Sequence, residues 1–228
     1  MGVSSICNPV QAIFNDFQLC RKEHIILIGS HGTGKSTLAE FLHLITGNVV
    51  VESVARIMRP VLKDMTDEMA QRHLFNTALW DFKRWVDVDT IMTRSPLDPI
   101  AYTFAAFRAT PDHEDFENMM QEFIDTVKGD ELAMHIIRNS YWVYVPIEFG
   151  LENDGVRPTD VEWQKFVDMG MRMLMKEFGI QPITVSGSVQ ERAKTVLLEI
   201  DKSLTQEELN ELIGDLGLDD EEADEEDD

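Results

Sequence analysis

Cysteine is nearly absent from the 228 residues. The two that occur, Cys7 and Cys20, do not have the spacing of metal ligands, which argues against a zinc-binding module or a disulfide scaffold. A disulfide between them is chemically conceivable, but free thiols are the expected state in a reducing compartment.

Long apolar runs are also missing. No stretch approaches the roughly 18 consecutive apolar residues that a membrane span requires. The first seven residues lack the basic and apolar regions of a secretory signal, and Ile6 stands where the myristoylation pattern needs Ser or Thr. We therefore expect a cytoplasmic protein without a membrane partner.

Basic residues are few: 20 Lys and Arg stand against 42 Asp and Glu, for a net charge of −22. Residues 207–228 contain 13 of those acids and no base, which leaves 29 acids and 20 bases in the rest of the chain. This balance does not indicate a broad nucleic-acid-binding surface, although a local basic groove is compatible with it. For residues 218–228 we expect a disordered, solvated tail, whose simplest role is solubility. Its other options are docking to a basic partner and competing with nucleic acid for a basic groove.

One motif dominates what is present. Residues 29–36 read Gly-Ser-His-Gly-Thr-Gly-Lys-Ser, which fits the phosphate-binding pattern Gly-x-x-x-x-Gly-Lys-Ser/Thr. In such a loop the backbone N–H groups point at the phosphates, the lysine reaches the β- and γ-phosphates, and the Ser hydroxyl holds Mg²⁺. The predicted nucleotide-binding residues are Gly29, Ser30, His31, Gly32, Thr33, Gly34, Lys35, Ser36 and Thr37, with Ser36 as the metal ligand.

The flanks of the motif have the expected context. Residues 24–28 form a short apolar run suited to a buried parallel strand. Downstream, apolar residues recur at helical spacing, at Leu38, Phe41, Leu42 and Ile45. The sequence therefore predicts a strand, a phosphate-binding loop and a helix in succession.

The remaining chain alternates between strand and helix patterns. We expect further strands over residues 49–52, 87–93 and 141–147, a fifth strand with its turn over residues 183–187, and amphipathic helices between them. This order predicts an α/β fold of about five parallel strands with helices on both faces, a P-loop three-layer sandwich. We divide the chain into an N-terminal helix (1–22), a P-loop domain (23–202), a short helix (203–217) introduced by a Thr205–Glu208 capping box, and the acidic tail (218–228).

Two charged residues follow predicted strands. Glu52 ends the second strand and Arg94 the third, and ligands of open α/β sheets gather beyond these strand ends. The structural alternatives for Glu52 are a carboxylate at a helix start or an ion pair with Arg56, and the alternative for Arg94 is an ion pair with Asp98. Residues 148–158 contain two glycines and Arg157, a pattern typical of a lid that closes over phosphates.

Missing motifs narrow the reaction. The guanine-reading Asn-Lys-x-Asp motif of GTPases and the Leu-Ser-Gly-Gly-Gln signature of transporter ATPases do not occur. Together with the short domain and the residues at the strand ends, this favours phosphoryl transfer to a small acceptor.

These motifs resemble a known group. The residues 29–36, 52–56, 93–102 and 154–157 look like those of the small P-loop kinases grouped with the ribosylnicotinamide kinase domain, many of them encoded by bacteriophages. They are similar, more distantly, to those of deoxynucleoside kinases. The likeness covers residues 22–200 and implies ATP and Mg²⁺ as cosubstrates, with a nucleoside or nucleotide as phosphate acceptor.

The resemblance also implies roles. Lys35 would neutralise the transferred phosphate, Glu52 would act as general base on the acceptor hydroxyl, and Arg94 and Arg157 would clamp phosphate. Thr93 departs from the pattern, because the related kinases carry Asp or Glu there, close to Mg²⁺; the metal would then rely on Ser36, water and either Glu52 or Asp98.

Two other functions also fit the sequence. One is a phage DNA-modification kinase that phosphorylates a hydroxymethylated pyrimidine base in DNA, and Trp80, Trp85 and Trp142 do not decide for or against it. The other is a non-kinase ATP-binding switch or regulatory module. The sequence does not indicate an oligomeric state.

Overall fold

The computed structural model describes residues 24–52, 67–109, 114–148 and 161–215. The predicted N-terminal helix, the acidic tail and the lid residue Arg157 lie outside these ranges. Within them, no helix is long and apolar enough to cross a membrane.

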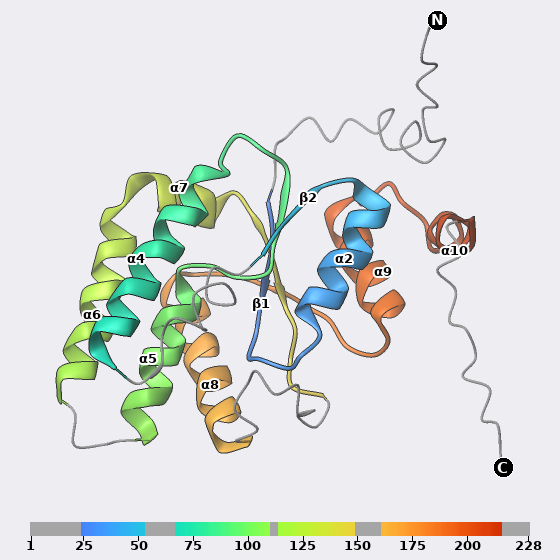
Figure 1. Cartoon of the computed structure of the whole chain (residues 1–228). Coiled ribbons are helices and arrows are strands. Elements are labelled where there is room, and N and C mark those ends of the chain that lie inside the picture. The colour runs from blue at the N-terminus through green and yellow to red at the C-terminus, as the bar shows by residue number, and fades with distance from the viewer. Residues whose placement is uncertain (1–23, 53–66, 110–113, 149–160, 216–228) are drawn as a thin grey trace, which may run out of the picture.

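The centre of the fold is a sheet of five parallel strands in the order β2-β3-β1-β4-β5 (Figure 1). The order confirms the predicted parallel sheet and places the strand that precedes the P-loop in the middle. The strands are β1 Ile25–Ile28, β2 Val49–Val51, β3 Thr90–Met92, β4 Tyr141–Tyr144 and β5 Ile183–Thr184.

Helices cover both faces of the sheet, as predicted (Figure 1). One face carries α4 Glu68–Arg84, α5 Leu97–Ala109, α6 Glu114–Gly129, α7 Glu131–Arg138 and α8 Val161–Glu177. The other carries α2 Lys35–Thr46 and α9 Val189–Ile200, with α10 Gln206–Asp215 packed outside them.

Strand β1 shows how the sequence makes two cores. Its four residues are all buried, but Ile26 and Ile28 belong to the core under α4–α8, while Ile25 and Leu27 belong to the core under α2 and α9. Successive side chains of a strand point to opposite faces, so an uninterrupted apolar run serves both. The apolar run therefore marks the central strand of the sandwich.

Helix starts follow local capping chemistry. The Asp67 side chain accepts the Ala70 N–H at 3.0 Å at the start of α4. The predicted capping box of α10 is present: Glu208 accepts the Thr205 N–H at 2.8 Å, and Thr205 Oγ1 accepts the Glu208 N–H at 3.2 Å. α10 begins at Gln206, and its Leu209, Leu212 and Ile213 are buried.

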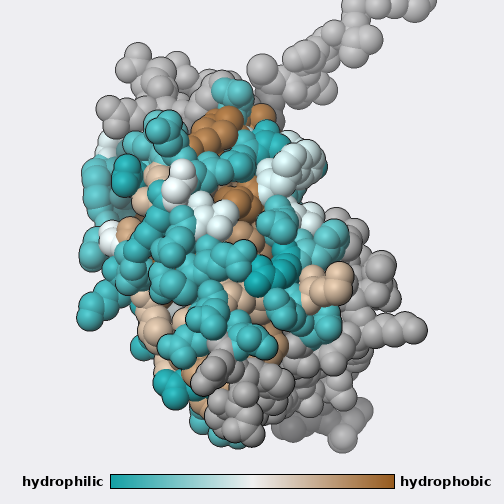
Figure 2. Space-filling model, turned by 90° about the vertical axis from the view of Figure 1, so that its left-hand side faces the viewer, coloured by the Kyte–Doolittle hydropathy of each residue, from teal (hydrophilic) through white to brown (hydrophobic). Residues whose placement is uncertain are grey.

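Helices α5 and α8 meet at a glycine. A Cβ at Gly170 would lie 3.1 Å from the Ala101 Cα and 3.2 Å from its carbonyl oxygen. This position therefore favours glycine because the two backbones approach so closely. Helices α4–α8 form one layer on the sheet. The outer side of this layer, where α4 and α6 lie, is mostly hydrophilic with a narrow hydrophobic strip (Figure 2).

Two predicted strands extend too far at their ends. β3 and β4 end at Met92 and Tyr144, before the predicted ends at residues 93 and 147, whereas β5 ends at Thr184, inside the predicted strand and turn of residues 183–187. The apolar residues that extended those predictions still pack inside, since Val145 and Val185 are buried. Burial continues past the end of each hydrogen-bonded ladder, and these residues lead the chain into the site.

Candidate active site

The P-loop lies between β1 and α2, and its glycines are required by geometry. A Cβ at Gly29 would lie 2.3 Å from the carbonyl oxygen of Val145. Gly34, the residue before α2, has a φ of 84°, in the left-handed region that side chains rarely adopt. Both positions leave the backbone close to its neighbours and free to present N–H groups, which fits a phosphate cradle.

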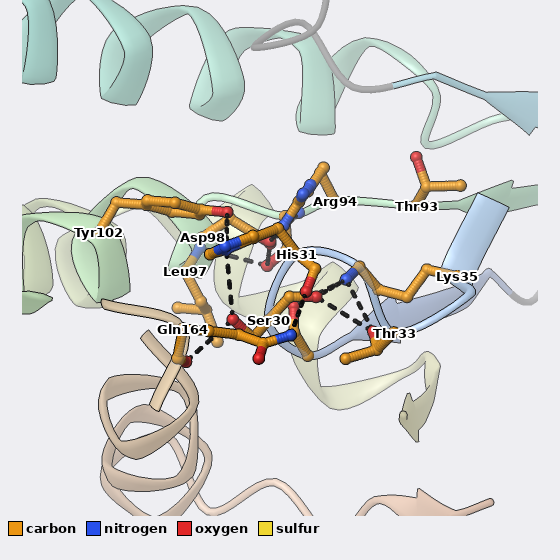
Figure 3. Close-up of polar contacts among 12 residues, drawn as sticks. Ser30, His31, Thr33, Lys35, Thr93, Arg94, Leu97, Asp98, Tyr102 and Gln164 are labelled. Atoms are coloured by element: carbon orange, nitrogen blue, oxygen red, sulfur yellow. Dashed lines mark hydrogen bonds and ion pairs between the residues drawn. The ribbon is translucent and has the colours of Figure 1, made fainter. Parts of the chain in front are cut away.

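Lys35 is buried at the start of α2, and its ammonium turns back to the loop (Figure 3). Nζ donates to the carbonyl oxygen of Gly29 at 2.8 Å, to that of Ser30, and to Thr33 Oγ1 at 3.3 Å. Charge-assisted bonds of this kind fix the cation at the loop. The ammonium of Lys35 therefore lies at the loop, and its binding to phosphate stays a prediction.

The loop is also held from outside by two residues that the sequence analysis did not select. Gln164 of α8 donates from Nε2 to the main-chain carbonyl of His31 at 2.8 Å. The main-chain carbonyl of Gln164 in turn accepts a hydrogen bond from the Ser30 hydroxyl at 3.0 Å. Arg192 of α9 donates from Nη1 to the Thr33 carbonyl at 2.8 Å. Both are buried on helix faces that are mostly apolar, and a polar residue on such a face was the available signal.

Arg94 follows β3 and forms a buried ion pair. Its Nη1 lies 2.7 Å from Asp98 Oδ1, with the two side chains 21% and 5% exposed. The other Asp98 oxygen accepts the Ser95 N–H at 2.8 Å and the Ser95 hydroxyl at 3.1 Å. Burial alone would lower the pKa of Arg94, but Tyr102 and Asp98 outweigh it and raise that pKa, so the guanidinium stays charged.

Arg94 and Glu52 share one pocket. The pocket lies beyond the ends of β2 and β3 and is closed by α4 and the start of α5. Its lining residues are Val51, Glu52, Ala78, Asp81, Phe82, Met92, Arg94, Ser95, Asp98 and Pro99. Glu52 is exposed, so its carboxylate is open to a ligand there. The contribution of α4 was not predicted, because no charged pattern marks Ala78 or Phe82.

Tyr102 of α5 connects this pocket to the P-loop (Figure 3). Its hydroxyl lies 3.4 Å from His31 Nδ1, and its ring lies under the Arg94 guanidinium, 5.8 Å from ring centroid to Cζ. Tyr102 therefore contacts both a residue of the phosphate cradle and a residue of the pocket, so the two are adjacent.

The residues that could hold Mg²⁺ fit its preferences. Mg²⁺ keeps several waters and takes one or two protein oxygens together with substrate phosphates. The half-buried Ser36 hydroxyl at the start of α2 is such an oxygen. Among the described residues no group of three acidic, His or Cys side chains could hold a metal ion by itself. Thr93 is buried, and its hydroxyl donates to the Val51 carbonyl at 3.4 Å, so it supports the β2–β3 pairing.

The tryptophans do not line the pocket. Trp80 is 61% exposed, and the Arg84 guanidinium lies over its ring at 5.2 Å. Trp142 is buried in β4 and donates from Nε1 to the Ile137 carbonyl at 2.9 Å. Trp85 is partly buried and packs against the core.

A protein-family model described as an AAA domain matches residues 24–192, most of the chain. The chain belongs to this AAA domain family. The match includes the P-loop, the pocket and Arg192. A comparison of this chain with curated proteins found no match.

Solved structures share the fold of this AAA domain. Deoxyadenosine kinase from M. mycoides with bound dATP aligns with a TM-score of 0.61 at 11% identity, covering 78% of this chain and 98% of that one. Its dCTP complex gives 0.57 at 13% identity, covering 79% and 100%. The form with the products dCMP and dCDP gives 0.53 at 12%, covering 79% and 98%. These matches confirm the predicted P-loop kinase fold. Membership of the ribosylnicotinamide-kinase-like group and a phage origin stay predictions.

Proposed function

We propose that the protein is an ATP- and Mg²⁺-dependent kinase that transfers the γ-phosphate to a nucleoside or nucleotide. The observation that carries the proposal is the adjacency of a phosphate cradle and a pocket containing Glu52 and Arg94, joined by Tyr102. A simple ATP-binding switch has no need for a second pocket with a carboxylate and an arginine beside the phosphates.

The donor half is the P-loop. Its backbone N–H groups and the N-terminus of α2 bind the phosphates, and the Lys35 ammonium exchanges its loop carbonyls for β- and γ-phosphate oxygens. Bound Mg²⁺ supplies charge neutralisation on the same phosphates, with Ser36 as its protein oxygen.

The acceptor half is the pocket. The acceptor hydroxyl oxygen attacks the γ-phosphorus, its proton passes to the Glu52 carboxylate, and the bond to the β–γ bridging oxygen breaks. Arg94 neutralises charge on the transferred group, because its ion pair with Asp98 uses only part of its five donors. Arg157 is proposed to contact the phosphates from the lid segment.

A nucleoside-type acceptor is supported by analogy with the fold. The structurally similar proteins are deoxyadenosine kinases whose structures contain dATP, dCTP, or dCMP and dCDP. Fold similarity at this identity does not carry substrate choice by itself, so the acceptor needs its own test.

The test is a transfer screen with ATP labelled at the γ-phosphate. Nucleosides, nucleotides and hydroxymethylated DNA serve as acceptors, with Lys35→Ala as the inactive control. Label on a nucleoside or nucleotide supports the proposal, and label only on DNA supports a DNA-modification kinase. Slow release of phosphate that no acceptor stimulates would contradict the kinase proposal and would favour an ATP-binding switch.

A further inference from the structure

Arg192 of α9 joins three segments of the active-site edge through one buried guanidinium. Nη1 donates to the Thr33 carbonyl at 2.8 Å, Nε to the Gly187 carbonyl at 2.9 Å, and Nη2 to Glu148 Oε2 at 2.8 Å. The side chain is only 4% exposed. Because the guanidinium is planar and donates hydrogen bonds in three directions, it connects the three segments rigidly.

The three segments follow β1, β4 and β5, which are neighbours in the sheet. Glu148 adds a second bond to the last of them, because its Oε2 accepts the Gly187 N–H at 3.1 Å. The turn between β5 and α9, residues 185–188, is thus tied to the P-loop through a charged bridge made by Arg192 and Glu148.

The direction of the donor nucleotide follows from the position of the pocket. The pocket containing Glu52 lies at the ends of β2 and β3, on one side of β1. The transferred γ-phosphate has to face this pocket, so the sugar and base extend to the other side, across the ends of β4 and β5. The bridge therefore lies between the part of the site that binds phosphates and the part that faces the base.

We propose that Arg192 is a positioning residue for the donor: with Glu148 it fixes the spacing between the phosphate cradle and the β5–α9 turn. A nucleoside triphosphate can then contact the cradle and the turn together, and binding does not carry the entropic cost of ordering them. The inference deepens the donor half of the proposed function and rests on it in two ways: for nucleotide binding at the P-loop and for the direction in which the γ-phosphate points.

The cradle has supports of its own that survive loss of the bridge. Thr33 Oγ1 donates to the Ser30 carbonyl at 3.0 Å, and Gln164 Nε2 donates to the His31 carbonyl at 2.8 Å. A ligand that touches only the cradle, such as inorganic tripolyphosphate, is therefore expected to bind without the bridge. ATP, which extends past the cradle, is expected to need it.

The test variant is Arg192→Met with Glu148→Gln. It removes one positive and one negative charge together, so the net charge near the phosphates is unchanged and no ionised partner is left buried. Lys194→Met, which removes a cation from the same helix, is the matched control. Thermal unfolding of each variant checks the fold.

The experiment is calorimetric titration of each protein with Mg·ATP and with Mg·tripolyphosphate. For the double variant we expect the Kd of ATP to rise about tenfold or more and that of tripolyphosphate to stay within about threefold. The control keeps both values. Equal weakening of both ligands, or unchanged ATP binding, overturns the inference.

Two outcomes need separate treatment. If the double variant does not fold, Glu148→Gln alone replaces it: weaker ATP binding with unchanged tripolyphosphate binding supports the inference, and any other pattern overturns it. If the wild type binds ATP but transfers no phosphate to any acceptor, the kinase proposal fails while the Arg192 inference is still decided by the titrations. A wild type that does not bind ATP overturns both.

Discussion

The proposed donor side and the proposed acceptor side of the sheet differ in which parts of the chain form them. The donor side is one contiguous loop whose main chain forms the cradle, with Gly29 and Gly34 where side chains would collide or strain the backbone. The acceptor side is a set of side chains from the ends of β2 and β3 and from α4. A site made of main-chain groups can be recognised from a contiguous sequence motif, whereas a site made of side chains from distant segments forms only when the chain folds.

The two sides also differ in how they are stabilised. The P-loop receives buried hydrogen bonds from α8 and α9, through Gln164 and Arg192. Arg94 on the acceptor side depends on one buried ion pair with Asp98. Substitution of a single supporting residue should therefore disturb the surrounding structure less on the donor side than on the acceptor side.

The largest effect is expected for Lys35→Ala. Loss of the ammonium removes the cation nearest the transferred phosphate, and we expect the rate of phosphoryl transfer to fall roughly a thousandfold or more. Circular dichroism and thermal unfolding should be close to those of the wild type, because the loop glycines and their neighbours are unchanged. Measurable transfer near the wild-type rate would refute the assigned donor role.

The next effect concerns stability. Asp98→Asn removes the charge that pairs with the buried Arg94, and we expect unfolding in denaturant to show a loss of about 3 kcal/mol. The comparison is Glu122→Gln, which breaks the ion pair between Arg72 and Glu122, whose side chains are 37% and 57% exposed. That exposed pair should contribute less than about 1 kcal/mol. Similar losses in the two variants would remove the distinction between the buried and the exposed pair.

A smaller effect is expected where the two sides meet. Tyr102→Phe keeps the ring beneath Arg94 but removes the hydroxyl next to His31. A hydrogen bond of this length contributes modestly, so we expect kcat to fall by about tenfold at most, with ATP affinity nearly unchanged. Steady-state kinetics at varied ATP and acceptor would measure it. A change in ATP affinity alone would place Tyr102 on the donor side only.

Nearly all of the donor side could be predicted from the sequence. The loop from Gly29 to Ser36 is contiguous, and its strand and helix were visible from apolar spacing. The acceptor side could be predicted in part, because Glu52 and Arg94 stand at strand ends, a rule of parallel sheets. Their catalytic roles are still predictions.

The supports of the P-loop could not be read from the chain. Gln164 lies 133 positions from His31, and Arg192 lies 159 positions from Thr33. Periodicity identifies the faces of α8 and α9 as buried but does not say what a polar residue on them meets. The strand ends were misplaced for a related reason, since burial continues beyond the ladder at Val145 and Val185.

The most direct test of the central claim, a donor cradle beside an acceptor pocket, is Glu52→Gln. With the best acceptor of the screen, ATP affinity and the turnover of acceptor phosphorylation are measured together in the variant and the wild type. We expect turnover to fall about a hundredfold or more while the Kd of ATP stays within about twofold. Equal losses in both quantities would contradict the claim and make Glu52 a structural residue of the P-loop domain.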